Sequence, residues 1–259
     1  MQVVLMAGGK GERLAAVSGG LPKPLVRLHE RPILAWTLEG LIRRGAQHIC
    51  VCVGPNAAPF ERELVHELSR EVRIDFVTEE QPLGTIGALL QCPLQADQPC
   101  VVMNGDVITT FDPRLLLQQL EQESSDWCIA AHEASFITRF GEVRANSEGV
   151  LAEYREKPRV SHQFSSGIYA ISAKVRQHLA ESKQLAAEPL PEMLKHLLQQ
   201  GFQVDLLPHE ELWIDINDQD DLAIAERELS KQHLQAIVGL GAAPKREAQP
   251  RFGERGWAF

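Results

Sequence analysis

Two aspartates of this chain stand where a carboxylate could hold a metal ion. Asp106 follows an apolar run that is typical of a buried strand, and Asp215 follows a shorter apolar stretch. Neither is needed as a helix cap, because Asp112, and later Asn217 or Asp218, are better placed to cap the helices that follow. A carboxylate past the end of a buried strand can hold Mg²⁺ against phosphate oxygens, although a turn aspartate has the same sequence context.

Phosphate could be bound near the N-terminus, where glycines and positive charges follow an apolar run. Residues 7–13 are Ala-Gly-Gly-Lys-Gly-Glu-Arg, and Lys23 stands between Pro22 and Pro24. Glycines leave backbone N–H groups open to phosphate oxygens, and the prolines restrict the backbone around the lysine. The segment lacks the P-loop pattern, and Leu14 stands where a dinucleotide-binding fingerprint needs a third glycine. A tight turn without a ligand remains the alternative interpretation.

A second loop with possible ligand contacts follows the third predicted strand. Gln81 offers a donor and an acceptor suited to a base edge, Gly84 permits close backbone approach, and Thr85 can cap the following helix. The pattern alone fits an ordinary loop and helix start equally well.

Strands and helices alternate along the first half of the chain. Apolar and β-branched runs predict strands at residues 3–6, 48–53, 72–77 and 100–103, with helices at 32–44 and 60–68 between the first three. This alternation predicts an α/β fold with a doubly wound, mostly parallel sheet, whose ligands bind outside the carboxyl ends of the strands.

The pattern changes after residue 131. Short strands near residues 141–143 and 150–154 predict a small antiparallel region over the carboxyl edge, which we expect to receive a second substrate. Within it, Glu156 and Lys157 precede Pro158, an arrangement that fixes another lysine but also fits a solvated charge pair. Regular structure returns with a helix at 191–198, a strand at 204–207 and a helix from Leu222 to about Leu229.

Composition restricts the class of protein. The chain has 259 residues and a formal net charge of −9, which argues against a nucleic-acid-binding surface. No apolar run approaches the roughly 20 residues of a membrane helix and no signal peptide precedes the first strand, so we expect a cytoplasmic protein without a membrane partner. Neither the five cysteines nor the nine histidines show metal-ligand or disulfide spacing, and we interpret the cysteines as small core residues.

Several of these segments, in the same order, resemble the signature motifs of the sugar-1-phosphate nucleotidyltransferases. The matching segments are Gly8-Gly9-Lys10-Gly11-Glu12-Arg13-Leu14, Pro22-Lys23-Pro24, Pro82-Leu83-Gly84-Thr85-Ile86-Gly87-Ala88, Gly105-Asp106, Glu156-Lys157-Pro158 and Trp213-Ile214-Asp215. The chain departs from the family pattern at three places: Glu12 replaces a threonine, Ser165-Ser166 replaces Asn-Ala, and Asn217 replaces a glycine.

The resemblance implies a Rossmann-like nucleotidyltransferase fold and a role for each matched residue. It implies catalytic roles for Arg13, Lys23 and Lys157; nucleotide contacts from Ala7, Gly8, Gly9, Gly11, Gln81, Gly84 and Thr85; sugar contacts from Gly141, Glu156, Ser165 and Ser166; and Mg²⁺ ligation by Asp106 and Asp215. One domain is expected over residues 1–235, with 1–131 mainly binding nucleotide and 132–210 mainly binding sugar phosphate. Residues 236–259 are expected to form a mobile tail, whose terminal aromatic residues could dock on a partner subunit in a homo-oligomer.

The reaction implied by the resemblance is attack of a sugar 1-phosphate on the α-phosphorus of an NTP, which gives an NDP-sugar and pyrophosphate. The amino-acid sequences of the motifs are most similar to those of the heptose-1-phosphate guanylyltransferase branch, so GTP is the expected nucleotide. Uridylyl or thymidylyl transfer to a hexose 1-phosphate is the alternative. A non-catalytic subunit that senses nucleotide sugars is an alternative from another functional class. A nicotinamide-dependent oxidoreductase is not favoured, because the chain lacks the third glycine of the dinucleotide-binding fingerprint and an acidic residue placed to bind the ribose.

Overall fold

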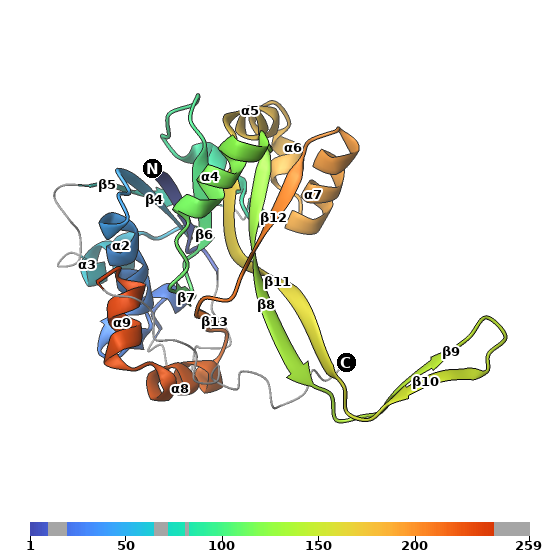
Figure 1. Cartoon of the computed structure of the whole chain (residues 1–259). Helices are drawn as coiled ribbons and strands as arrows, with labels where there is room; N and C mark the ends of the chain where they lie inside the picture. Colours follow the sequence, from blue (N-terminus) through green and yellow to red (C-terminus); the bar gives the residue numbers. More distant parts are fainter. Residues whose placement is uncertain (10–19, 65–71, 81–82, 241–259) are drawn as a thin grey trace.

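The fold is built on one large mixed sheet (Figure 1). The computed structural model describes residues 1–9, 20–64, 72–80 and 83–240. A seven-stranded sheet has the order β12-β8-β11-β6-β1-β4-β5. Its strands are β1 (Gln2–Met6), β4 (His48–Val53), β5 (Arg73–Thr78), β6 (Cys100–Asn104), β8 (Trp127–Ile137), β11 (Arg159–Ile171) and β12 (Val204–His209). Only β11 runs antiparallel to its sheet neighbours, which confirms the mostly parallel α/β sheet predicted from the alternation.

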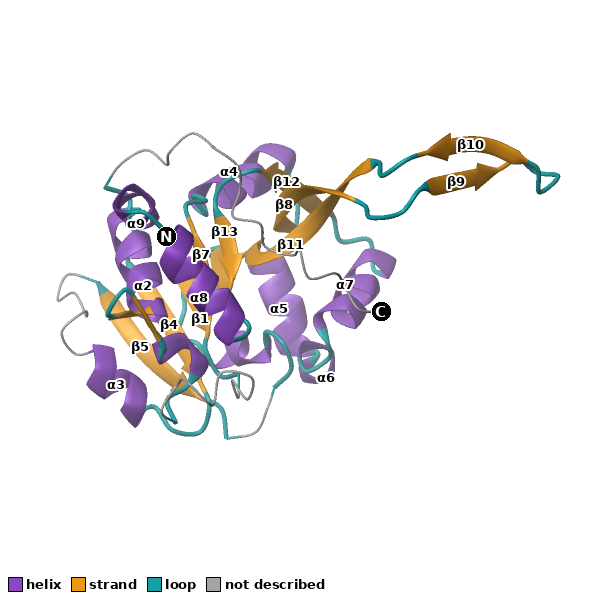
Figure 2. Cartoon of the chain, turned by 90° about the horizontal axis from the view of Figure 1, so that it is seen from below, coloured by secondary structure: helices purple, strands orange, loops and turns teal. Residues whose placement is uncertain are grey.

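Helices cover both faces of this sheet (Figure 2). They are α2 (Ile33–Arg43), α3 (Ala58–Leu64), α4 (Arg114–Glu123), α5 (Ala173–Glu181), α6 (Lys183–Ala186), α7 (Leu190–Gln199), α8 (Gln219–Glu228) and α9 (Lys231–Ile237), with short 3₁₀ turns η2 (Lys23–Leu25) and η3 (Gly87–Gln91). On one face, α2 and α4 pack on the side chains of Val3 and Leu5. On the other, α5 and α7 pack on Val4. Burial on both faces explains the nearly continuous apolar runs of the parallel strands.

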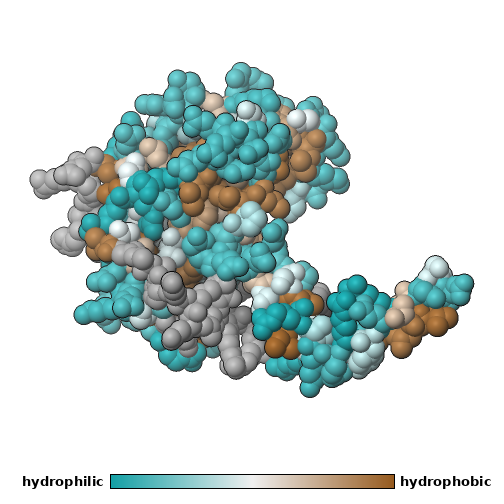
Figure 3. Space-filling view, viewed as in Figure 1, coloured by the Kyte–Doolittle hydropathy of each residue, from teal (hydrophilic) through white to brown (hydrophobic). Residues whose placement is uncertain are grey.

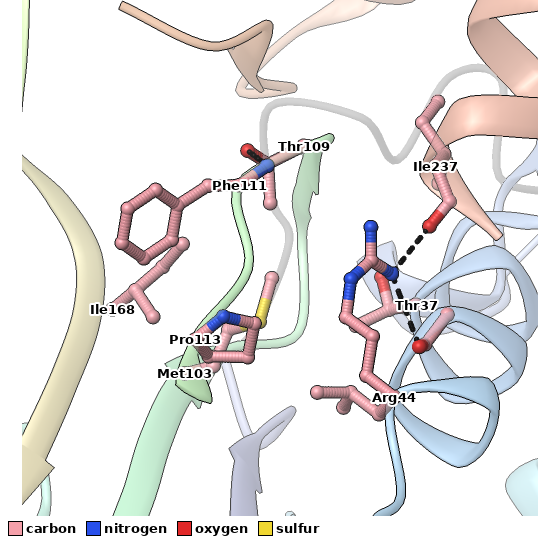
Figure 4. Close-up of a pocket in the computed structure, with 10 residues that line it drawn as sticks. Thr37, Arg44, Met103, Thr109, Phe111, Pro113, Ile168 and Ile237 are labelled. Atoms are coloured by element: carbon pink, nitrogen blue, oxygen red, sulfur yellow. Dashed lines mark hydrogen bonds between the residues drawn. The ribbon is translucent and has the colours of Figure 1, made fainter. Parts of the chain in front are cut away.

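The C-terminal boundary of the fold lies later than the sequence predicted. Helix α9 continues through Ile237, and the side chains of Ala236, Ile237 and Val238 are buried. The guanidinium of Arg44, at the end of α2, donates a hydrogen bond to the carbonyl of Ile237 at 2.8 Å (Figure 4). It donates a second one to the carbonyl of Ala236 at 3.2 Å. Residues 236–240 therefore belong to the folded unit rather than to a tail, and residues 241–259 lie outside the described part of the chain.

The predicted antiparallel region is present, but its position differs from the prediction. Strands β8 and β11 pair as far as Ile137 and Arg159. The hairpin of β9 (Glu142–Ala145) and β10 (Leu151–Arg155) continues beyond them. Figures 1 and 2 show this arm projecting away from the sheet, so it does not cover the carboxyl edge.

The arm exposes large apolar side chains, and hydrophobic residues are visible near its tip (Figure 3). The exposed residues on the arm and at its base are Phe136, Ile137, Phe140, Val143, Val150, Leu151 and Tyr154. Exposed apolar patches of this kind mark surfaces of interaction in folded proteins.

Among the helices of the described residues, none combines the length and the apolar character needed to cross a membrane.

Candidate active site

Strand pairing brings the two predicted metal-binding aspartates together. Asp106 lies between β6 and the short strand β7 (Val107–Thr109), and Asp215 ends β13 (Trp213–Asp215). Strands β7 and β13 pair antiparallel, with Asp215 opposite Val107, and the N–H of Ile216 donates to the carbonyl of Asp106 at 3.4 Å. Residues 109 positions apart in sequence thus share the carboxyl edge of the sheet, as a metal site requires.

Lys23 lies against this pair of carboxylates. Its Nζ is 2.6 Å from Oδ2 of Asp106 and 3.9 Å from Oδ1 of Asp215, and it donates a hydrogen bond of 3.1 Å to Oδ1 of Asn217. Only 12% of the lysine side chain is exposed. The lysine begins η2, and the prolines on both sides hold this turn in place, because the carbonyl of Pro22 accepts from Leu25 N–H at 2.9 Å. An ammonium group therefore takes the position that a cation would take between two carboxylates.

The electrostatics of the pair favour a bound cation. Burial, and then the charge of Asp106, raise the pKa of the Asp215 carboxyl. The Oδ1 atom of Asp106 is buried and accepts no hydrogen bond from the described residues. Mg²⁺ prefers one or two carboxylates together with substrate phosphates, so this donor set fits it.

The first glycines of the N-terminal loop lie beside the carboxylates. Ala7 is buried, and its N–H donates to the carbonyl of Cys52 at 2.7 Å. Gly105 N–H donates to the carbonyl of Met6 at 2.9 Å, which joins the end of β1 to the segment that carries Asp106. Gly8 and Gly9 are exposed at this edge. Of the other predicted phosphate and base contacts, Gly11, Arg13 and Gln81 lie outside the described residues.

A carboxylate that the sequence reasoning missed also borders the loop. Glu79 directly follows β5, and its Oε1 lies 3.1 Å from the position that a Cβ would take on Gly8. Its Oε2 accepts a hydrogen bond from Leu83 N–H at 3.2 Å, and burial raises the pKa of the carboxyl. The signal that identified Asp106, an acidic residue just past a parallel strand, applies equally to Glu79.

The predicted base and ribose loop contacts another part of the protein. Gly84 has φ +80°, and a Cβ placed on it would lie 2.5 Å from the carbonyl oxygen of Ala187. Thr85 does not cap the 3₁₀ turn η3 that follows it, because η3 begins at Gly87 without a side-chain cap; its Oγ1 accepts instead from the N–H of Leu190, the first residue of α7, at 3.4 Å. Gly84 and Thr85 thus hold the loop against the segment between α6 and α7, and their contact with a nucleotide stays a prediction.

Three predicted substrate contacts lie on the arm. Gly141, Glu156 and Lys157 are exposed, and the hydroxyl of Tyr154 donates to Oε2 of Glu156 at 2.8 Å. Residues 156–158 connect β10 to β11 at the outer end of the ribbon. The structure therefore does not bring Glu156 and Lys157 to the site of Lys23, and their substrate contacts stay predictions.

The adjacent serines of β11 have different environments. Ser165 is exposed, and its hydroxyl shares a 3.1 Å hydrogen bond with that of Tyr169. Ser166 is 0% exposed, shares a 2.6 Å hydrogen bond with Nε2 of His209, and accepts from Nε1 of Trp213 through its carbonyl at 2.9 Å. The side chain of Ser166 therefore lies inside the protein, and the predicted sugar contact of this residue stays a prediction.

A small pocket elsewhere in the molecule is separate from this site. Arg44, Phe111 and Ile237 are among the residues that line it (Figure 4). None of its lining residues is one of the predicted site residues, and the Arg44 guanidinium is already engaged with backbone carbonyls.

The fold and the site together define a class of protein. A parallel α/β sheet that carries a lysine, two carboxylates and a glycine-containing loop at the carboxyl ends of its strands is suited to binding a nucleotide with its metal ion. The chain belongs to the nucleotidyl transferase family, whose model matches residues 2–232. This confirms the family that the sequence motifs indicated.

Individual relatives agree with the family. The mannose-1-phosphate guanylyltransferase catalytic subunit beta of Drosophila pseudoobscura pseudoobscura is 30% identical over 227 residues, which cover 85% of this chain and 60% of the relative. The D-glycero-alpha-D-manno-heptose 1-phosphate guanylyltransferase of Campylobacter jejuni is 24% identical over 193 residues, 73% of this chain and 83% of the relative. The crystal structure of HddC from Yersinia pseudotuberculosis superposes with a TM-score of 0.67 and 26% identity, covering 88% of this chain and 98% of HddC. The chain thus spans only about 60% of the length of the mannose-1-phosphate guanylyltransferase that it matches.

Proposed function

We propose that this protein transfers a nucleotidyl group from an NTP to a sugar 1-phosphate and releases pyrophosphate. The observation that carries the proposal is the cluster of Asp106, Asp215 and Lys23 at the carboxyl edge of the sheet, beside Gly8 and Gly9. Because the attacking sugar phosphate is already an anion, the reaction needs no protein nucleophile. Positioning of the two substrates in line and neutralisation of the charge on the α-phosphate supply most of the rate enhancement.

Each charged group has a proposed task. Asp106 and Asp215 would hold Mg²⁺, which when bound neutralises phosphate charge. Lys23, held at the same edge, would contact the phosphates of the nucleotide. Arg13 would add a second positive charge there, and Lys157 would hold the phosphate of the sugar. The last role requires the ribbon of β8 and β11 to carry residues 156–158 towards the carboxyl edge.

We propose GTP as the nucleotide and a manno-configured sugar 1-phosphate, either a heptose or a hexose, as the acceptor. The two named relatives support this choice, because one is a mannose-1-phosphate guanylyltransferase and the other acts on a manno-heptose 1-phosphate. The cytoplasm is the proposed location, since all five cysteines are buried free thiols and disulfides are rare in that compartment. A homo-oligomer is proposed from the apolar side chains of the arm, and light scattering would measure it.

One assay tests the reaction and both substrates. The purified chain is incubated with Mg²⁺, each NTP in turn and a panel of sugar 1-phosphates that includes mannose 1-phosphate and manno-heptose 1-phosphate, and pyrophosphate release is measured. We expect release with GTP and a manno-configured sugar phosphate, and none from the Asp106→Asn variant. Release at the wild-type rate from that variant would refute the metal assignment. Nucleotide binding without turnover across the whole panel would refute the proposed activity.

A further inference from the structure

Metal-ligating side chains cluster at the sheet edge formed by β4 and β5. His48 begins β4, and Cys50, two residues later, points to the same face of the strand. The parallel pairing of β4 with β5 sets Asp75 opposite Cys50. One nitrogen, one sulfur and one oxygen from these three residues lie within 4.8 Å of one another. Sequence spacing alone did not reveal this group, because its acidic member comes from another strand.

The distances show a row of donor atoms that runs from the surface inwards. Nε2 of His48 lies 2.6 Å from Oδ2 of Asp75 and 3.6 Å from Sγ of Cys50. Further inside, the Sγ atoms of Cys92 and Cys52 lie 3.5 Å apart. The side chains of His48 and Asp75 are 12% and 30% exposed, whereas Cys50 is fully buried. An ion can therefore enter from the surface and meet a sulfur ligand beneath.

We propose that His48, Cys50 and Asp75 bind a thiophilic divalent cation, Zn²⁺ in particular, at this edge of the sheet. Imidazole nitrogen, thiolate sulfur and carboxylate oxygen are the three donor types that Zn²⁺ uses in proteins, at bond lengths of about 2.0–2.3 Å. Tetrahedral bonds of these lengths set ligand atoms roughly 3.3–3.7 Å apart. The separation of His48 from Cys50 already lies in this range, and the His48–Asp75 hydrogen bond opens when the ion replaces its proton.

Two neighbouring interactions are compatible with such an ion. Nε of Arg73 lies 2.9 Å from Oδ2 of Asp75, the oxygen that also contacts His48, so Oδ1 takes part in neither contact. The Arg73 side chain is 61% exposed and free to turn into solvent. The neighbouring Cys92 thiol, and then burial, raise the pKa of the Cys50 thiol, so the metal must displace the thiol proton and its binding competes with protonation.

This site is distinct from the proposed catalytic centre. His48 lies at the start of β4, whereas Asp106 follows the end of the parallel strand β6, so the two groups occupy opposite ends of the sheet. The ion would tie the edge strand β5 to β4, which adds stability without a part in nucleotidyl transfer. A ligand bound only by the folded state raises the midpoint of thermal unfolding.

Cobalt substitution tests the site without an activity assay. The reduced full-length chain is titrated with Co²⁺ in excess Mg²⁺, and absorption is recorded for a thiolate-to-cobalt charge-transfer band and for tetrahedral d–d bands. Cobalt on the oxygen ligands of Asp106 and Asp215 gives no thiolate band. We expect the band at one equivalent in the wild type, its loss in Cys50→Ser and His48→Gln, and its retention in Cys128→Ser, a matched variant of a buried cysteine in β8. Zn²⁺ should likewise raise Tm only in the proteins that show the band.

The outcome is decisive even if one variant folds poorly. Circular dichroism identifies an unfolded Cys50→Ser variant, in which case the partly exposed His48→Gln variant decides. Absence of the band in the wild type overturns the proposal. Its persistence in either folded variant also overturns it, because the ion then lies elsewhere.

Discussion

Replacing Ser166 with alanine should cost stability and leave sugar binding intact. The hydroxyl is 0% exposed and shares a 2.6 Å hydrogen bond with Nε2 of His209. The methyl group of alanine offers no partner to that buried nitrogen, and an unsatisfied buried polar atom costs about 1–3 kcal/mol. At about 2–4 °C per kcal/mol for a chain of this size, Tm should fall by about 2–12 °C.

The adjacent Ser165→Ala variant is the matched control. Its hydroxyl is exposed and bonds to that of Tyr169, so its loss should cost about 0.5–1.5 kcal/mol. Urea unfolding gives the free energy of each variant, and pyrophosphate release at varied sugar phosphate gives KM. We expect a raised KM only for Ser165→Ala and the larger stability loss only for Ser166→Ala. A raised KM in Ser166→Ala at unchanged stability would refute the assignment of its side chain to the interior.

Three further variants test the site and the loop beside it. Asp106→Asn should abolish measurable turnover, a loss of about 10²-fold or more, with an unchanged circular dichroism spectrum. Without Mg²⁺, the Asp215→Asn variant should have a larger free energy of unfolding at pH 7 than the wild type. The reason is that the pKa of the Asp215 carboxyl is raised in the folded state, so its negative charge destabilises that state. Urea unfolding should show the difference between the two proteins vanishing as the pH falls towards 3.8, the ordinary pKa of an aspartate. Gly84→Ala should lower the free energy of unfolding, measured in urea, by about 2–5 kcal/mol, because of left-handed backbone strain and of the contact with Ala187. The control is Gly45→Ala, where φ is +84° and the space around the residue is open, so strain alone should lower it by about 1–2 kcal/mol.

The parallel half of the fold was predictable because its signals are local. Burial on both faces makes β1, β4 and β6 continuous apolar runs, and turns or amphipathic helices separate them. The carboxyl ends of such strands must share an edge, which is why Asp106 and the loop after β1 could be assigned to one site. Asp218 caps α8 as expected, with Asp221 completing a capping box.

What the sequence did not predict depends on contacts between distant segments. The pairing of Asp215 with the residue after Asp106 follows from the register of β13 on β7. The buried position of Ser166 follows from β12, which supplies His209, and from β13, which supplies Trp213. The course of the arm beyond the sheet has no counterpart in the strand pattern, because a hairpin has the same alternation whether it lies over the sheet or extends from it.

In the proposed function, Lys23 would link metal binding to nucleotide binding. Its ammonium group has three N–H donors, which the carboxylates and Asn217 already share, so binding a phosphate would weaken its contact with Asp106, which is now 2.6 Å long. A weaker contact would leave the charge of Asp106 less compensated beside Asp215, whose carboxyl pKa is raised first by burial and then by that charge. A divalent cation held by Asp106 and Asp215 would offset this repulsion and would leave the lysine available for phosphate. Under the proposed function, binding of the metal and binding of the phosphate would therefore favour each other.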